Sequence, residues 1–249
     1  MARNEATMTG DARYVARPAS GPDDVRRAQA LRAQGFGRPG GTDHDGFDDI
    51  CMHVLIEERT TGRLVCCFRV MILTGGCDIA QSYSAQFYEL SALGEFDGRM
   101  AEVGRFCIAP DLHDPDILRV AWAALTRLVD DESIEMLFGC SSFKGVRADT
   151  YLDAFAMLRE RHLAPPEWGP RVKAPRVFRF AQKLRRYRPD LKQAMRHMPP
   201  LLRTYLVMGG WVSDHAVIDR ELDTLHVFTG VEVGAIPDRR KQALRALAG

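Results

Sequence analysis

The chain has 249 residues, of which 46% are hydrophobic and 27% charged, and its formal net charge is +1. This length and composition are ordinary for a globular protein with one large domain or two small ones. No stretch reaches the roughly 18 apolar residues of a membrane-spanning helix, and residues 1–14 lack the apolar core of a signal peptide. We therefore expect a cytoplasmic protein, at most peripheral on the inner face of the cytoplasmic membrane.

The predicted elements describe a mixed α/β protein. The first half begins with an edge strand at 12–17, a helix capped by Ser20 and ending at Gly35, two hairpin strands at 52–58 and 63–73, and a short helix near 84–93. A strand at 101–110, a helix at 117–130 capped by Asp114 or Asp116, a strand at 134–140 and a helix at 148–161 follow. The chain ends with an irregular stretch at 164–188, helices at 189–197 and 199–208, strands at 212–218 and 225–233, and a helical tail from Pro237. The strand, loop, helix and strand from 101 to 140 predict one pair of parallel neighbours. One domain over 1–249 with a basic helical insertion at 164–209 is the simplest organisation.

The strand at 101–110 is the centre of this organisation and carries two ionisable residues, Glu102 and Arg105, on either side of Gly104. Strict alternation would place Glu102 and Arg105 on opposite faces of the sheet. A bulge at Gly104 would interrupt this alternation of faces and bring both side chains toward one cleft. A structural ion pair at the end of the strand is the alternative explanation.

The six cysteines, at positions 51, 66, 67, 77, 107 and 140, include no CxxC pair. Reduced thiols fit this pattern better than a disulfide framework. Cys51 with His53, and Cys66 with Cys67, do not have the spacing of a metal site. The sequence therefore predicts no bound metal. Cys107 on a buried strand is more typical of a core residue than of a nucleophile.

The charge is unevenly distributed along the chain. Residues 171–203 contain 11 Lys and Arg and one acid, Asp190, which gives this segment a net charge of +10. The remainder has 23 basic and 32 acidic residues, a net charge of −9. A basic block on an acidic body is typical of a surface that binds an anionic partner, and a merely solvated basic face is the alternative.

Several charged residues fall on the predicted strand ends, where they could recognise a zwitterion, with carboxylates for its ammonium and arginines for its carboxylate. These are Asp45, Asp48, His53, Arg69, Glu102, Arg105 and Asp219. An amine recognised in this way must lose a proton before it acts as a nucleophile, and Glu102 is the natural general base, either directly or through one water. Arg105 is predicted as the second catalytic residue beside it. A carbonyl oxygen of the electrophile would lie near a free backbone N–H of the splayed strand.

These residues resemble a known pattern. Asp45-Gly-Phe-Asp48, then Arg69, then Glu102-Val-Gly-Arg105-Phe is similar to the D-x-[FY]-D, R and E-x-x-R pattern of acyl-homoserine-lactone synthases and their relatives. The sequence more closely resembles the ornithine N-acyltransferases that initiate ornithine-lipid synthesis, once called hemolysin-like. Blocks that resemble this family, in the right order, are 47–53, 102–107, 137–143, 199–205 and 216–219.

The resemblance implies a GNAT-like acyltransferase fold, with a mixed, mostly antiparallel sheet, a bulged central strand and flanking helices. It implies transfer of a 3-hydroxyacyl chain from acyl-carrier protein to the α-amine of ornithine, with the phosphopantetheine thioester as donor and no metal, acetyl-CoA or other cofactor. The loop at 111–116 agrees, since it lacks the glycine-rich cradle that binds the pyrophosphate of CoA. The donor arm would run near Phe106, Cys107, Ile108, Ser141 and Ser142. The carrier protein or anionic lipid would bind to the basic residues Arg179, Lys183, Arg185, Arg186 and Arg188.

Two other functions remain possible from the sequence. An acyl-homoserine-lactone synthase would need S-adenosylmethionine, and the blocks at 199–205 and 216–219 argue against it. A non-catalytic module that binds carrier protein or membrane would not need Glu102 and Arg105. No feature predicts a nucleic-acid partner.

Overall fold

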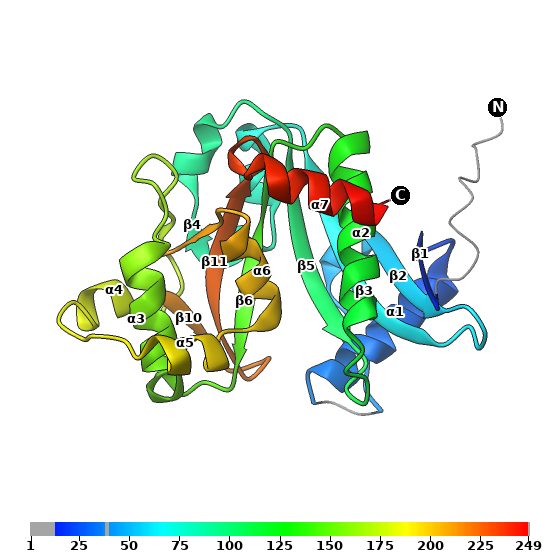
Figure 1. Ribbon diagram of the computed structural model, residues 1–249, viewed down its shortest axis with the longest axis horizontal. Helices are drawn as coiled ribbons and strands as arrows, with labels where there is room; N and C mark the ends of the chain where they lie inside the picture. Colours follow the sequence, from blue (N-terminus) through cyan, green and yellow to red (C-terminus); the bar gives the residue numbers. More distant parts are fainter. Residues whose placement is uncertain (1–12, 38–39, 249) are drawn as a thin grey trace. The chain divides into compact units, whose positions relative to one another are not determined.

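The computed structural model describes residues 13–37 and 40–248, which form two compact units (Figure 1). The first unit contains residues 13–70, 105–131 and 241–248, and the second contains 71–104 and 132–240. The lead-in expected over 1–12 lies outside the described residues. No helix within the described ranges is long and apolar enough to cross a membrane.

The first unit combines two whole strands and parts of two others with two long helices. Its elements are β1 (Tyr14–Pro18), α1 (Pro22–Gly35), β2 (Met52–Glu58), β3 (Leu64–Leu73) as far as Val70, β5 (Met100–Ile108) from Arg105 onward, α2 (Pro115–Asp131), most of α7 (Asp238–Ala248), and the 3-10 turn η1 (Gly46–Asp49). β2 pairs antiparallel with β1 and with β3, so the predicted hairpin is confirmed. α1 packs on β2, and α2 packs on β1 and β2.

Consecutive residues of β2 and β3 are buried, which requires cover on both faces of these strands. One layer of that core is formed by Ala28 and Leu31 of α1 with Cys67, Cys107 and Ala109. Burial raises the pKa of the Cys107 thiol to about 12. Cys107 is therefore packed in the core of the first unit, next to α1.

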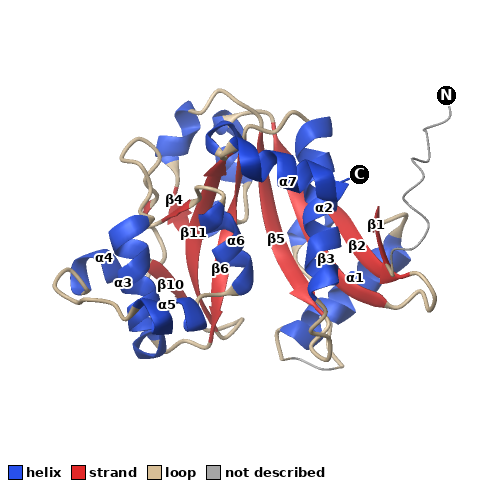
Figure 2. Ribbon diagram, viewed as in Figure 1, coloured by secondary structure: helices blue, strands red, loops and turns tan. Residues whose placement is uncertain are grey.

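The second unit contains the remaining strands and the helices of the basic segment (Figure 2). Its elements are β4 (Tyr88–Glu89), β5 as far as Gly104, β6 (Met136–Lys144), α3 (Leu152–Arg161), β7 (Arg171–Val172), β8 (Val177–Phe178), α4 (Phe180–Lys183), α5 (Leu191–His197), α6 (Pro200–Val207), β9 (Trp211–Val212), β10 (Ala216–Asp219), β11 (Thr224–Glu232) and the 3-10 turns η2 (Gly76–Gln81), η3 (Ser84–Gln86), η4 (Ser91–Glu95), η5 (Ala148–Tyr151) and η6 (Val233–Ala235).

β6 is parallel to the first half of β5, as predicted, and antiparallel to β11 over nine residue pairs. β11 also pairs antiparallel with β9 and β10. A single strand at 212–218 was expected, but the hydroxyl of Ser213 accepts a hydrogen bond from the Phe228 amide and donates to the His215 carbonyl. The segment therefore turns at Ser213–His215 and divides into two short strands. α3 packs against α4 and α5 over a core that includes Phe143, Phe155 and Leu202.

β5 is irregular where the sequence predicted a bulge, but one residue later. Its parallel pairing with β6 extends from Met100 to Glu102. Gly104 does not have a positive φ, whereas Arg105 has a φ of +52°. The left-handed conformation is uncommon for a residue with a Cβ, so surrounding contacts must hold Arg105 in place. The positive φ therefore lies at Arg105, the residue after the glycine at which the sequence predicted the bulge.

The start of α1 is stabilised by an ion pair and not by the predicted cap. Gly21 is the N-cap residue, and Ser20 instead donates from its amide and its hydroxyl to Asp24, both at 2.9 Å. The guanidinium of Arg17, followed by the Ser20 amide, holds the pKa of Asp24 well below its ordinary value. For α2, Asp114 accepts from the Asp116 amide, so Asp114 is the better of the two predicted caps.

A depressed carboxyl pKa stabilises the fold fully above the ordinary aspartate pKa of about 4, and this contribution is lost as the pH falls toward the folded-state value. Asp24→Asn should lower the free energy of unfolding by about 1–3 kcal/mol near neutral pH. The difference from the wild type should shrink below about pH 4, as measured by urea unfolding across that range. Asp23→Asn is the control, because the Asp23 side chain is 87% exposed. A difference that stays constant down to the acid limit of folding would contradict this assignment.

Candidate active site

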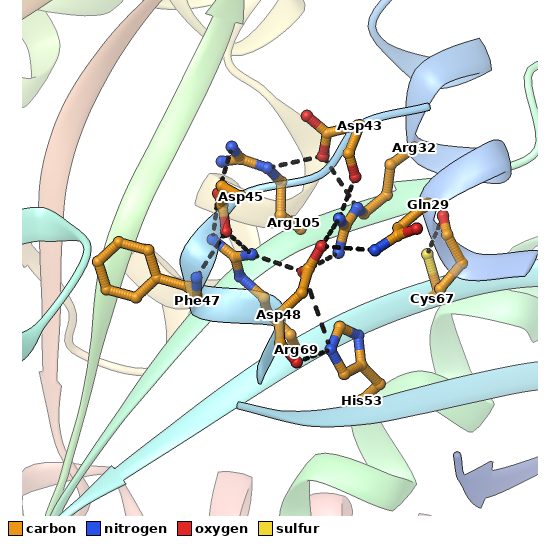
Figure 3. Close-up of polar contacts among 11 residues, drawn as sticks. Gln29, Arg32, Asp43, Asp45, Phe47, Asp48, His53, Cys67, Arg69 and Arg105 are labelled. Carbon is orange, nitrogen blue, oxygen red and sulfur yellow. Dashed lines mark hydrogen bonds and ion pairs between the residues drawn. The ribbon is translucent and has the colours of Figure 1, made fainter. Parts of the chain in front are cut away.

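Three arginines and three aspartates of the first unit form one connected network (Figure 3). Arg32 comes from α1, Arg69 from β3 and Arg105 from β5, while Asp43, Asp45 and Asp48 come from the loop and 3-10 turn before β2. Elements distant in the sequence therefore meet at one group of charges. The network contains equal numbers of cations and anions, which limits the cost of burying them.

Asp48 is the centre of the network. It accepts hydrogen bonds from Arg32 at 2.8 and 2.7 Å, from Arg69 at 2.8 Å and from Gln29 at 3.0 Å. Its side chain is 1% exposed. Burial alone raises the pKa of Asp48, but the hydrogen bonds and charge of Arg32, with help from Gln29 and Arg69, outweigh it and hold the pKa well below the usual range. Asp48 is thus a buried carboxylate that fixes two guanidinium groups.

Asp45 and Arg105 lie at the more accessible end of the network. Arg69 donates to both oxygens of Asp45, at 2.5 and 2.9 Å, and Arg105 donates to Asp45 at 3.0 Å. Arg105 also donates to Asp43 at 2.9 Å, and these contacts explain how its strained backbone conformation is held. The side chains of Asp45 and Arg105 are 26% and 10% exposed, whereas that of Arg69 is 3% exposed.

Two aromatic rings line the guanidinium groups of this network. The Arg69 guanidinium lies 5.4 Å from the centre of the Phe47 ring, and that of Arg105 lies 5.7 Å from the Phe36 ring. Both distances are within the range of a cation–π contact. His53 is buried, with Nε2 3.0 Å from the backbone oxygen of Asp48. The histidine therefore supports the turn that carries Asp48.

Sequence reasoning identified Asp45, Asp48, His53, Arg69 and Arg105, and the structure brings these five together. It missed Arg32, Gln29 and Asp43. A signal for Arg32 existed, because it lies one turn after Ala28 on the apolar stripe of its helix, where an unpaired arginine would be costly. Asp43 precedes the recognised motif and gave no separate signal.

Glu102 occupies a different setting, in the second unit. Its carboxylate accepts from the backbone amides of Tyr83 and Ser84, both at 2.7 Å, and from the Ser84 hydroxyl at 2.5 Å. The Ser84 oxygen also lies 3.5 Å from Cys140 Sγ. Glu102 is 5% exposed and Ser84 is fully buried. The carboxylate is therefore oriented by several donors at the start of η3.

The helix predicted near 84–93 is instead two 3-10 turns, η3 and η4, with β4 between them. This is the reason that Ser84 was not recognised as a contact of Glu102. Its side chain and amide are directed by a turn of three residues, which leaves no periodic pattern in the sequence.

The other predicted residues have separate positions. Asp219 accepts from the amides of Glu221 at 2.9 Å and Leu222 at 3.1 Å, so its carboxylate closes the turn from β10 to β11. The Phe106 ring stacks on Phe68 with centres 5.3 Å apart. Ser141 is buried and its hydroxyl accepts from Thr229 at 2.9 Å, while Ile108 is half-buried and Ser142 is exposed.

Residues 27–123 match the family described as an acetyltransferase (GNAT) domain. This segment includes the whole Arg–Asp network and Glu102. Together with the α/β architecture and its mostly antiparallel strands, the match shows that the chain has a GNAT-like fold.

The chain is, more particularly, a relative of the L-ornithine N(alpha)-acyltransferases. It is 29% identical over 245 residues to the one from Rhodobacter capsulatus, which covers 92% of this chain and 93% of that protein. It is 27% identical over 204 residues to the one from Brucella abortus, which covers 79% of this chain and 72% of that protein. Among solved structures, the AHL synthase LasI aligns over 88% of this chain and 90% of its own, with 17% identity and a TM-score of 0.43. The resemblance inferred from the motifs is confirmed.

Proposed function

We propose that the chain transfers a 3-hydroxyacyl group from the thioester of acyl-carrier protein to the α-amine of L-ornithine, with lyso-ornithine lipid as product. The observation that carries the proposal is the similarity to L-ornithine N(alpha)-acyltransferases over 92% of the chain. The charged groups of the two units are of the types that a zwitterionic acceptor requires.

Glu102 is assigned the role of general base. The α-ammonium of the acceptor must lose a proton before its nitrogen attacks the thioester carbon, and a positioned carboxylate accepts such a proton directly or through one water. The bonds from Tyr83 and Ser84 support this role because they fix the orientation of the carboxylate. After the C–N bond forms, the C–S bond breaks and the carrier thiol leaves.

Asp45 and Arg105 are assigned to recognition of the amino acid. They are the most exposed anion and cation of the network, and each already binds a charged partner. A zwitterion bound here would break the ion pair between Asp45 and Arg105. Two new ion pairs would replace it, one between the ammonium of the zwitterion and Asp45 and one between its carboxylate and Arg105. Asp48, His53 and Arg69 are buried and would act by holding these two side chains in position.

The donor is assigned to two further sets of residues. Phe106, Cys107, Ile108, Ser141 and Ser142 would contact the acyl chain and pantetheine arm. The exposed basic residues Arg179, Lys183, Arg185, Arg186 and Arg188 would dock an anionic partner, either the acidic carrier protein or a membrane.

The test is a product assay with pure protein and 3-hydroxyacyl carrier protein. Ornithine, other amino acids and S-adenosylmethionine are supplied separately, and products are identified by mass spectrometry. An N-acylated ornithine is the expected product. A lactone formed from S-adenosylmethionine would replace the proposal with a homoserine-lactone synthase, and no product with any amine would leave a binding module.

A further inference from the structure

One face of the second unit combines exposed cations with exposed apolar side chains. We call it the α5 face. Its cations are Arg185, Arg186, Arg188, Lys192 and Arg196, and its apolar members are Tyr187, Leu191 and Met195, which are 36%, 42% and 43% exposed. Large apolar side chains exposed together within nine residues are unusual enough to call for a partner.

The loop before α5 is held firmly to α3. Arg159 donates to the backbone oxygens of Leu184 and Tyr187. Asp153 accepts from the Asp190 amide at 2.8 Å and from the Tyr187 hydroxyl at 3.2 Å. The position of the Tyr187 ring is therefore set by contacts to α3.

The inner side of α5 is equally well defined. Ala194 and Met198 are buried in the core that α3 shares with α5. Lys192 and Arg196 lie about one turn apart on the opposite side, and Leu191 and Met195 lie about one turn apart beside them. The helix thus presents a cationic ridge with an apolar edge.

The positive charge of this face is only partly compensated, because two acids, Asp153 and Asp190, lie beside its five cations. No ion pair is recorded for any of its five cations among the residues that the structure describes. The one acid of the segment, Asp190, is the N-cap of α5 and accepts from the amides of Lys192 and Gln193. The face therefore presents a net positive field to any anionic partner.

We propose that the α5 face binds the surface of an anionic lipid bilayer. Tyr187, Leu191 and Met195 enter the boundary between headgroups and acyl chains, and the arginines and lysines contact lipid phosphates. Charge alone would suit any polyanion, but a purely ionic partner would leave Leu191 and Met195 in water. Long cationic side chains beside apolar ones are suited to an interface that is apolar below and charged above. This inference does not depend on the proposed reaction, because binding is measured without substrates.

Sedimentation with vesicles tests the proposal. Wild-type protein should bind vesicles of phosphatidylcholine with about 30 mol% phosphatidylglycerol, should bind pure phosphatidylcholine weakly, and should lose affinity as salt is added. Arg185→Ala/Arg186→Ala/Arg188→Ala should weaken binding about 100-fold, at about fivefold for each cation removed. Leu191→Ser/Met195→Ser should weaken it about tenfold although the charge is unchanged.

The matched control is Arg59→Ala/Arg220→Ala/Arg240→Ala, which removes three exposed cations elsewhere on the chain. It should bind vesicles nearly as well as the wild type, and circular dichroism should show that every variant is folded. Equal losses in both triple variants, or unchanged binding by the Leu191 and Met195 variant, would overturn the proposal. Binding of acyl-carrier protein that the first triple variant abolishes, without binding to anionic vesicles, would assign the face to an acidic protein instead.

Discussion

Asp48→Ala should lower the free energy of unfolding by about 3–5 kcal/mol, because removing one partner of a buried ion pair leaves uncompensated charge in the interior. Asp48 binds both Arg32 and Arg69, and the side chains of these arginines are 1% and 3% exposed. Neither guanidinium can reach water without moving part of α1 or β3. Urea unfolding followed by circular dichroism near neutral pH measures the loss directly.

Asp49→Ala is the matched control, since Asp49 is the next residue of the same 3-10 turn and is exposed. We expect a change within about 0.5 kcal/mol for it. Asp48→Asn keeps the volume of the side chain and removes its charge. Its free energy of unfolding should therefore be higher than that of Asp48→Ala but well below that of the wild type. Similar unfolding midpoints for the Asp48 and Asp49 alanine variants would mean that the network contributes little to stability.

The regular elements of this fold were predictable because their signals are local. The helix expected at 117–130 is observed as α2 at Pro115–Asp131, and its apolar spacing places Ile117, Ala121 and Leu125 in the core. The hairpin strands were recognised from apolar runs on either side of the turn that contains Gly62. Such patterns depend on residues that are neighbours in the sequence.

The irregular elements depend on distant residues and were not predictable in this way. The break between β9 and β10 is formed by Ser213 with Phe228 on another strand. The strained conformation of Arg105 is supported by Asp43 and Asp45, which lie some sixty positions earlier. Nothing within a window around either residue reveals these contacts.

In the candidate site, too, some features were predictable from the sequence and others depend on distant residues. Residue types and order identified Asp45, Asp48, Arg69, Glu102 and Arg105, because carboxylates and arginines on strand ends are chemically conspicuous. Their accessibility could not be predicted, since it depends on how α1 covers the loop before β2. Burial separates Asp48, which is inaccessible, from Asp45, which is three positions away and 26% exposed.

Glu102→Gln should reduce turnover by about 100-fold or more, as expected when a general base is lost. The amide is nearly isosteric, and its oxygen can still accept from the Tyr83 or Ser84 amide, so we expect the fold to be retained. Steady-state kinetics with ornithine and 3-hydroxyacyl carrier protein give the turnover, and circular dichroism checks the fold. Ser84→Ala keeps the carboxylate but removes its 2.5 Å hydroxyl donor, and should reduce turnover by about tenfold or less.

Glu95→Gln makes the same chemical change at an exposed position of the same unit and should leave turnover unaltered. Proton abstraction by Glu102 predicts that the Gln variant loses turnover with little change in the apparent affinity for ornithine, since the base acts in the transition state. A Glu102→Gln enzyme that turns over within about threefold of the wild type would be incompatible with general-base catalysis by this carboxylate. In that case the hydrogen bonds to Tyr83 and Ser84 would identify Glu102 as an anchor for η3, and the proton acceptor would have to be sought elsewhere in the protein.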